Sequence, residues 1–391
     1  MKYNVSEIPF GEYLCEVFPD DFSLRNGLPV EVSECDDCGF EVSLSREKVV
    51  IRYSDISHLC TALGDLISED IHSSFRHPIN FRAIMLDCSR NAVPKISFLK
   101  EALIRMSLMG MNYFCLYTED TYQVDGEPLI GFARGAYSKD EIRDLVEFAE
   151  RFGITMFPCI QTLGHLEQIL KYSNYRNLKD NDRVLNALLP ETFDFVSKLI
   201  SEASEPYKSK IIHLGMDETW GIGRGASFTP GVPVNPRRIY AEYVAKVAKI
   251  CDEKGLKPVI WGDFVLGRSG EAAMSDEEIS LIPKNVTLNY WNYHNEDETI
   301  YERDFDKIKK SGFDCISSPG LWTWSLFFPD VAKMRKTAGP MMNVIHRCKM
   351  DKVMMTLWGD DGSECLLSSC WLALSYFFAA CRKPQPEEQF Y

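Results

Sequence analysis

Two hydrophobic patterns divide the chain near residue 80. Before that point, residues 40–44 and 49–53 are predicted to be strands, and a Ser-Asp cap at residues 54–55 starts an amphipathic helix. The apolar face of this helix carries Ile56, Leu59, Leu63, Leu66 and Ile67. The pattern predicts a small α+β domain over residues 1–80 that packs against a larger neighbour.

From residue 81 onward, short apolar runs alternate with amphipathic segments of helical spacing. The runs suit buried parallel strands, which show no alternation because both faces are covered. We expect strands at residues 83–86, 113–117, 155–160, 211–214, 258–261, 286–291, 315–317 and 353–357. The helices that follow them are expected at residues 96–109, 139–152, 185–202, 237–254, 276–280, 299–310, 330–346 and 364–380. Eight such units predict an α/β fold, a (β/α)8 TIM barrel, over residues 81–382.

A doubly wound open sheet is the competing architecture. Such a sheet usually has fewer strands and a glycine-rich phosphate loop after the first one, whereas residues 87–90 here are Asp-Cys-Ser-Arg. The barrel is therefore favoured. Residues 383–391 are expected to be a tail, or a linker to a further domain.

Composition narrows the class of protein. The length of 391 residues is enough for a large core and suggests two domains. Of these residues, 45% are hydrophobic and 26% are charged, as in ordinary globular proteins. The net charge of -14 and the absence of a long Lys/Arg block argue against a nucleic-acid surface. No apolar stretch has the length of a membrane span, and residues 1–7 do not form a secretory signal, so we expect a cytoplasmic protein.

The cysteines and histidines give little sign of a metal site. The 13 cysteines are odd in number and scattered, which fits a reducing compartment. Cys35-Asp36-Asp37-Cys38 is a lone C-x-x-C motif, for which a metal or redox role is a minor alternative. The seven histidines show no pair at short helical spacing, and His213 is expected to be a hydrogen-bonded core residue. We therefore expect neither a metal nor a cofactor.

The strongest chemical signal lies in residues 211–220. An apolar strand ends at Gly215, and Asp217 and Glu218 follow at its carboxyl end, where α/β barrels carry their active sites. Two adjacent carboxylates oppose each other's ionisation, so one can hold a proton near neutral pH and act as a general acid. The structural alternative is a helix start, with Asp217 as the N-cap and Glu218 in the first turn.

Aromatic and acidic residues recur at the ends of the other predicted strands. Six of the seven tryptophans lie at or after strands four to eight, and Trp371 falls inside the last helix. Indole rings stack on the C–H faces of sugars and carboxylates bind hydroxyls, so the pattern predicts a sugar pocket. The residues expected at this rim include Arg82, Glu119, His165, Trp220, Trp261, Asp263, Trp291, Tyr293, Trp322, Trp324, Trp358 and Asp360.

Three motifs carry a resemblance to a known family. Residues 213–218, His-Leu-Gly-Met-Asp-Glu, resemble the H-x-G-G-D-E signature of family 20 glycoside hydrolases, the β-N-acetylhexosaminidases. Residues 81–90 resemble the opening barrel strand of that family, and residues 160–167 resemble its hexosaminidase D-like branch. The resemblance covers residues 81–380, and the leading α+β unit is similar to the small domain that precedes the barrel in this family.

The resemblance implies a retaining exo-β-N-acetylhexosaminidase that removes terminal GlcNAc and/or GalNAc. Its nucleophile would be the substrate's own 2-acetamido oxygen, through an oxazolinium intermediate. By resemblance, Glu218 is the general acid and base, Asp217 holds the acetamido N–H, and Tyr293 donates to the acetamido oxygen. The implied partner is a glycan or glycoconjugate ending in β-N-acetylhexosamine, and a homodimer is a candidate assembly.

The resemblance also implies binding residues. Arg82 and Asp360 are expected to bind ring hydroxyls, while Glu119 and His165 form a relay that tunes Glu218. The tryptophans expected to wall the sugar are Trp261, Trp291, Trp324 and Trp358, with Trp322 as an alternative to Trp324.

The chain departs from the family pattern at three positions. Met216 replaces the second glycine of the signature, Gln161 stands where many members have Asp, and Asp360 stands where many have Glu. The last change leaves the choice between GlcNAc and GalNAc open. Two other functions also remain: a carbohydrate-binding barrel without catalysis, and a conventional retaining glycosidase with Asp263 or Asp360 as nucleophile.

Overall fold

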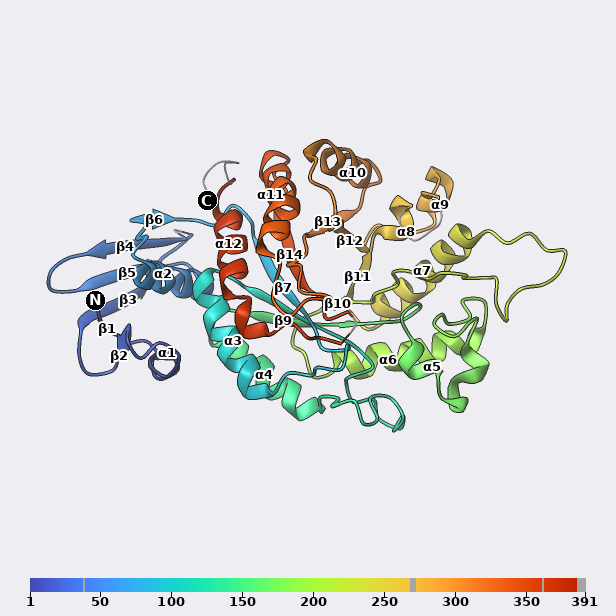
Figure 1. Ribbon diagram of the computed structural model, residues 1–391, viewed down its shortest axis with the longest axis horizontal. Helices are drawn as coiled ribbons and strands as arrows, with labels where there is room; N and C mark the ends of the chain where they lie inside the picture. Colours follow the sequence, from blue (N-terminus) through green and yellow to red (C-terminus); the bar gives the residue numbers. More distant parts are fainter. Residues whose placement is uncertain (38, 268–271, 361, 385–391) are drawn as a thin grey trace.

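The computed structural model describes residues 1–37, 39–267, 272–360 and 362–384. A six-stranded mixed sheet lies at one end of the molecule, and a closed barrel of parallel strands forms the rest (Figure 1). The sheet has the order β2-β1-β3-β5-β4-β6. Its strands are β1 (Tyr3–Asn4), β2 (Phe22–Ser23), β3 (Leu28–Glu34), β4 (Phe40–Leu44), β5 (Val49–Tyr53) and β6 (Ser74–Phe75).

Two helices accompany this sheet, α1 (Gly11–Val17) and α2 (Ile56–Ser68). The predicted cap of α2 is confirmed, because the Asp55 side chain accepts a hydrogen bond from the His58 backbone. Helix α2 packs against α3 (Ile96–Met109) of the barrel, and a Cβ at Gly64 would collide with the Leu108 carbonyl oxygen. The absence of a side chain at Gly64 therefore permits the close contact between the two parts.

The predicted barrel is confirmed, with the strand order β10-β11-β12-β13-β14-β7-β8-β9 and closure between β9 and β10. The strands are β7 (Phe81–Asp87), β8 (Tyr113–Glu119), β9 (Thr155–Ile160), β10 (Ile211–His213), β11 (Lys257–Trp261), β12 (Thr287–Trp291), β13 (Asp314–Ser318) and β14 (Lys352–Leu357). The main helices are α3 (Ile96–Met109), α4 (Lys139–Glu150), α6 (Pro190–Ser204), α7 (Pro236–Glu253), α10 (Glu298–Lys310), α11 (Val331–Arg347) and α12 (Trp371–Arg382). Shorter helical turns are α5 (Glu167–Leu170), η1 (Ser173–Leu178), α8 (Asp263–Leu266), α9 (Asp276–Ser280) and η2 (Leu367–Ser369).

Several predicted element limits are wrong. Helix α6 begins at Pro190 rather than at residue 185, since proline is favoured in the first helical turn and Leu185 forms an isolated β-bridge with Lys179. Helix α12 begins at Trp371 rather than at residue 364, after the 3-10 turn η2. Strands β1, β2, β3 and β6 were not predicted, because they are short or partly exposed and give a weak periodic signal.

The barrel interior is a packed core rather than a pore. Its buried side chains include Met85, Phe157 and Met354, together with the thiols of Cys115 and Cys159, which fill space as small apolar groups. In the predicted C-x-x-C motif, Cys35 is disulfide-bonded and Cys38 lies outside the described residues.

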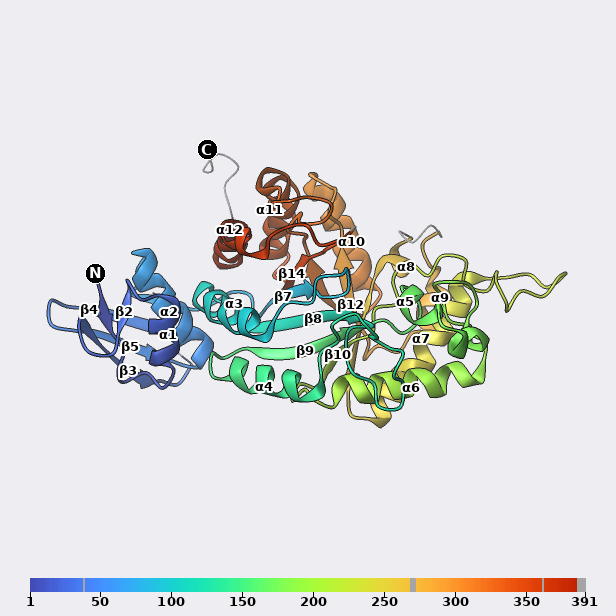
Figure 2. The same ribbon diagram turned by 60° about the horizontal axis from the view of Figure 1, so that its bottom comes forward.

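Long connections after β9 and β10 build one side of the barrel mouth. The segment between β10 and α7 projects at the end of the molecule opposite the N-terminal sheet, as both views show (Figures 1 and 2). Within the described ranges, no helix combines the length and apolar character needed to cross a bilayer. Residues 385–391 of the expected tail lie outside the described residues.

Candidate active site

A pocket of about 240 Å³ opens at the carboxyl end of the barrel strands. It brings together side chains from the segments that follow six different strands, as expected for a barrel active site. Its lining residues are Arg90, His165, Asp217, Glu218, Trp291, Tyr293, His294, Trp324, Trp358 and Asp360. Asp217, Glu218 and six of the other residues predicted from strand ends therefore meet here, whereas Arg82, Glu119, Trp220, Trp261, Asp263 and Trp322 do not line the pocket.

The Asp217–Glu218 pair lies on a strained turn. Met216 and Glu218 have φ angles of 69° and 44°, a left-handed conformation that is unusual for residues with side chains. The Met216 backbone N–H donates to Gln161 Oε1 at 3.1 Å, and the Glu218 N–H donates to Asp263 Oδ2 at 3.1 Å. These two buried acceptors hold the turn. The alternative of a helix start is wrong, because the next helix begins only at Pro236.

Gly215 makes this turn possible. Its φ is 68°, and a Cβ at this position would collide with the carboxamide of Gln161. The same carboxamide donates through Nε2 to Asp217 Oδ1 at 2.8 Å. Gln161 therefore supports both the backbone and the first carboxylate of the pair.

The two carboxylates share one imidazole. His165 Nε2 lies 3.4 Å from Asp217 Oδ2 and 3.3 Å from Glu218 Oε2. Burial alone would raise the pKa of Asp217, but the charge and hydrogen bonds of His165 and Gln161 outweigh it and lower that pKa. Burial would lower the pKa of His165, but Asp217 and Glu218 outweigh it and raise that pKa. The site thus holds Asp217 as a carboxylate beside a cationic imidazole.

Glu119 lies behind His165 and belongs to the same network. Its Oε1 is 3.9 Å from His165 Nδ1, 3.3 Å from Arg90 Nη2, and accepts the Tyr117 hydroxyl at 2.7 Å. Burial raises the pKa of Glu119 to about 7, although Arg90 and His165 act in the opposite direction. Glu119 and His165 also have φ angles of 42° and 51°, so strain extends across the site.

The arginine that faces the pocket is Arg90, and the prediction of Arg82 is wrong. Arg82 is the second residue of β7, at the opposite end of the barrel, where it is 2% exposed and donates to the carbonyls of Gly110 and Ile79. Arg90 follows the carboxyl end of β7 and lies 3.5 Å from Asp360 Oδ1. Its guanidinium also covers the rings of Tyr117 and Trp358.

Stacked aromatic rings form one wall of the pocket. The Tyr293 ring lies 5.3 Å from both Trp291 and Trp324, and its hydroxyl accepts a hydrogen bond from Trp358 Nε1 at 2.8 Å. Burial raises the pKa of Tyr293, so its phenol keeps its proton.

The remaining two predicted tryptophans support this wall from behind. Trp322 stacks on Trp324 at 4.5 Å and donates to Thr337, away from the pocket. Trp261 is fully buried in the barrel between Trp358 and His213. Trp261 therefore has no surface open to the pocket, against the prediction, since inward-pointing strand residues fill the barrel rather than its mouth. Of the alternatives Trp322 and Trp324, Trp324 is the one that lines the pocket.

His213 is a core residue, as predicted. Its Nδ1 accepts the Gly215 N–H at 3.1 Å, and its Nε2 lies 3.1 Å from the Asn289 side chain. Burial lowers the pKa of His213 to about 3, so the imidazole is neutral. Among the residues that the structure describes, no cluster of three His, Cys, Asp or Glu side chains could hold a metal ion.

Sequence reasoning did not assign a role to Arg183 or His294. His294 lies at the pocket rim, with its ring edge against Trp322 at 5.2 Å. Arg183 comes from the long β9–α6 segment, and its Nη2 lies 3.8 Å from Glu218 Oε2. His294 follows Tyr293 directly and could have been found from the strand-end pattern, whereas no signal marked Arg183.

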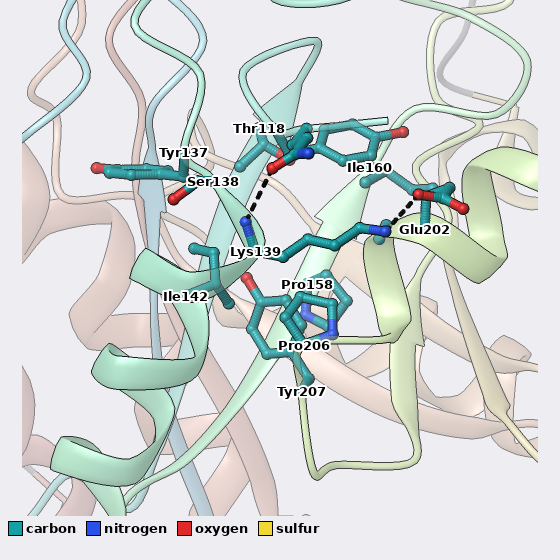
Figure 3. Close-up of a pocket in the computed structure, with 13 residues that line it drawn as sticks. Thr118, Tyr137, Ser138, Lys139, Ile142, Pro158, Ile160, Glu202, Pro206 and Tyr207 are labelled. Atoms are coloured by element: carbon teal, nitrogen blue, oxygen red, sulfur yellow. Dashed lines mark hydrogen bonds and ion pairs between the residues drawn. The ribbon is translucent and has the colours of Figure 1, made fainter. Parts of the chain in front are cut away.

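A second hollow lies beside the barrel, between α4 and α6 (Figure 3). Lys139 crosses it and pairs with Glu202 at 2.6 Å, an interaction drawn in Figure 3, and with Asp125 at 2.8 Å. Tyr207 and Pro158 close the apolar side. Because its ammonium group is matched by two carboxylates, this hollow is best explained as packing between the helices and the barrel.

The buried carboxyl group of Asp263, which holds the Asp217–Glu218 turn, is expected to make the stability of the protein depend on pH. Burial and the nearby Asp217 raise the pKa of Asp263 to about 7. The folded protein then holds a proton that the unfolded chain has lost above about pH 4, so this group makes the free energy of unfolding fall as pH rises toward 7. Asp263→Asn keeps an oxygen acceptor for the Glu218 N–H but has no carboxyl group to titrate. The free energy of unfolding of this variant, taken relative to wild type, is therefore expected to be higher at pH 8 than at pH 5, by on the order of 2 kcal/mol. Thermal unfolding at both pH values checks this, and parallel curves for the two proteins would contradict it.

Comparisons with known proteins agree with this geometry. A sequence model described as glycosyl hydrolase family 20, catalytic domain, matches residues 79–336. Hexosaminidase D of Bos taurus is 26% identical over 255 residues, which cover 62% of this chain and 70% of the bovine protein. Hexosaminidase D of Homo sapiens is 24% identical over 269 residues, which cover 64% of this chain and 51% of the human protein. This chain thus spans about half the length of the human relative.

Solved structures show the same fold. A family 20 exo-β-N-acetylglucosaminidase from Vibrio harveyi, in complex with N-acetylglucosamine, has a TM-score of 0.75 at 15% identity, covering 100% of this chain and 71% of that chain. A β-N-acetylhexosaminidase from Bacteroides fragilis has a TM-score of 0.73 at 18% identity, covering 99% of this chain and 88% of that chain. At these identities the likeness shows the fold alone.

Proposed function

This chain belongs to glycosyl hydrolase family 20, as a glycoside hydrolase of the β-hexosaminidase type, and we propose that it removes single terminal β-linked N-acetylhexosamine residues from glycans or glycoconjugates. In the proposed reaction the substrate's acetamido oxygen bonds to C1 while the bond from C1 to the leaving oxygen breaks. Glu218 gives its proton to that oxygen. Water then opens the oxazolinium at C1, gives its proton to Glu218, and the product keeps the β configuration.

The observation that carries the proposal is the environment of the Asp217–Glu218 turn. Asp217 is buried and charged, held by Gln161 and His165, and so suits an acetamido N–H that becomes positive as the oxygen attacks. Glu218 reaches the same pocket from the next position in the chain. A nucleophile from the protein is not needed if the substrate provides its own.

Other pocket residues support the recognition of an N-acetylated sugar. The Tyr293 hydroxyl accepts from Trp358, so its own proton is available for the acetamido oxygen. Arg90 and Asp360, which pair with each other in the pocket, are the proposed ligands of the ring hydroxyls. The Vibrio harveyi neighbour binds N-acetylglucosamine, which supports the same sugar here.

A conventional retaining glycosidase remains the second candidate. It requires a second carboxylate in the pocket as nucleophile. Asp263 does not line the pocket, and its Oδ2 is occupied by the Glu218 N–H, which speaks against it. Asp360 does line the pocket but is paired with Arg90, which speaks for a binding role.

Hydrolysis of four matched aryl glycosides tests the proposed function. We expect turnover of β-GlcNAc, β-GalNAc or both, and at least a 1,000-fold lower kcat/KM on β-Glc and β-Gal, because only the first two carry the internal nucleophile (~4 kcal/mol). Comparable turnover of β-Glc or β-Gal would support a carboxylate nucleophile instead. Binding without turnover of any of the four would support a carbohydrate-binding barrel.

A further inference from the structure

A guanidinium connects the Asp217–Glu218 turn with an exposed indole. Arg183 Nη2 lies 3.8 Å from Glu218 Oε2 and 3.3 Å from His165 Nδ1. The Arg183 Cζ atom lies 4.4 Å from the centre of the Trp220 ring, in cation–π contact. The Trp220 ring is therefore separated from the Glu218 carboxylate by a single planar group.

Two segments anchor Trp220 in this position. Its backbone N–H donates to the Glu218 carbonyl at 2.7 Å, and its own carbonyl accepts from Asn181 Nδ2 at 3.0 Å. The Asp180 carboxylate further holds the β10–α7 segment by accepting from the Gly223 and Ser227 backbones at 2.7 and 2.8 Å. The base of the indole is thus fixed by the β9–α6 and β10–α7 segments together.

The indole nevertheless stays available to a ligand. Trp220 is 47% exposed although Arg183 covers one of its faces. An aromatic ring that is fixed at its base and open on one face is well suited to stack on the C–H face of a sugar. The guanidinium of Arg183 beside this ring suits a ligand that bears hydroxyl groups rather than a lipid chain.

We propose that Trp220, backed by Arg183, binds the first sugar of the leaving group. This rests on the proposed function, because the leaving oxygen must lie beside Glu218 to receive its proton. The remaining lining residues of the pocket come from the ends of β7, β9, β12, β13 and β14, and Trp220 is an exposed aromatic ring only two positions after Glu218, so a group attached at that oxygen can reach its open face. A pyranose at this position stacks on the open face of the indole.

Two substrates with alkoxide leaving groups test the proposal. Methyl β-N-acetylglucosaminide and N,N′-diacetylchitobiose both need a proton from Glu218, but only the disaccharide has a sugar that can reach Trp220. For Trp220→Ala, we expect the ratio of kcat/KM for the disaccharide to that for the methyl glycoside to fall at least tenfold. Trp220→Phe, which keeps a flat ring, is expected to restore most of that ratio.

Phe228→Ala is the matched control, since Phe228 is a 50% exposed aromatic on the same β10–α7 segment. It is expected to leave the ratio within twofold of wild type. Equal losses on both substrates in Trp220→Ala, or the same fall of the ratio in Phe228→Ala, would overturn the proposal. If the wild type hydrolyses neither of these substrates and neither the aryl β-GlcNAc nor the aryl β-GalNAc glycoside, the proposed function is refuted instead, so the two failures are distinguishable.

Discussion

Glu218→Gln is expected to lower kcat/KM on N,N′-diacetylchitobiose by roughly 10²–10⁴-fold. Glutamine has nearly the shape of glutamate, and either end of its carboxamide can face His165 and Arg183, which now lie 3.3 and 3.8 Å from the carboxylate. It cannot, however, give a proton to the leaving oxygen or take one from water. Steady-state kinetics of the purified variant against wild type measure the loss.

The dependence on the leaving group separates acid catalysis from misfolding. A dinitrophenyl β-N-acetylglucosaminide leaves without a proton, so Glu218→Gln should lose much less in its first step on that substrate. Glu167→Gln is the matched control, because Glu167 pairs with the same Arg183 at 3.1 Å but does not line the pocket. We expect its kcat/KM within about threefold of wild type, the range of a surface ion pair. Equal losses on both leaving groups in Glu218→Gln would contradict its role as general acid.

Asp217→Asn is expected to lower kcat on the aryl β-N-acetylglucosaminide by roughly 10²–10³-fold, with a much smaller change in KM. The asparagine Oδ1 can still accept from Gln161 Nε2, so the geometry of the turn is kept. The lost charge matters most when the acetamido nitrogen becomes positive in the transition state. A variant that changes only KM would show that Asp217 binds the ground state, which would contradict the substrate-assisted reaction.

The stability of the same variant provides the control for folding. Burial raises the pKa of Asp217, but the charge and hydrogen bonds of His165 and Gln161 outweigh it and lower that pKa below the ordinary range. The stability that this carboxylate contributes is therefore present above about pH 4 and is lost as pH falls through its lowered pKa. The free energy of unfolding of Asp217→Asn should approach that of wild type in acid.

The sequence by itself determined the barrel and the position of its chemistry. Eight apolar runs followed by amphipathic helices allow few other arrangements, and parallel strands bring their carboxyl ends to one face. Asp217, Glu218, His165, Tyr293 and the neighbouring tryptophans therefore meet in one pocket, as the strand-end pattern predicts. That pattern depends on local spacing, which a sequence displays directly.

Only the tertiary structure decided which residues in or after a strand face the pocket. Arg82 and Arg90 lie in the same decapeptide, but β7 begins at Phe81, so Arg82 lies at the far end of the barrel and Arg90 at its mouth. The Trp261 side chain is buried inside the barrel, whereas Trp358 lines the pocket. Strand limits and side-chain direction depend on packing with neighbours, which local periodicity does not encode.

Contacts between distant segments were likewise beyond the sequence. Asp263 supports the Glu218 backbone from the next strand along the barrel, and Gln161 supports Asp217 from the preceding one. Arg183 reaches Glu218 from a long segment whose path is set by the fold. Such contacts join residues that are far apart in the chain. Only the folding of the barrel and its loops brings these residues within hydrogen-bonding distance, so their contacts cannot be read from the order of residues.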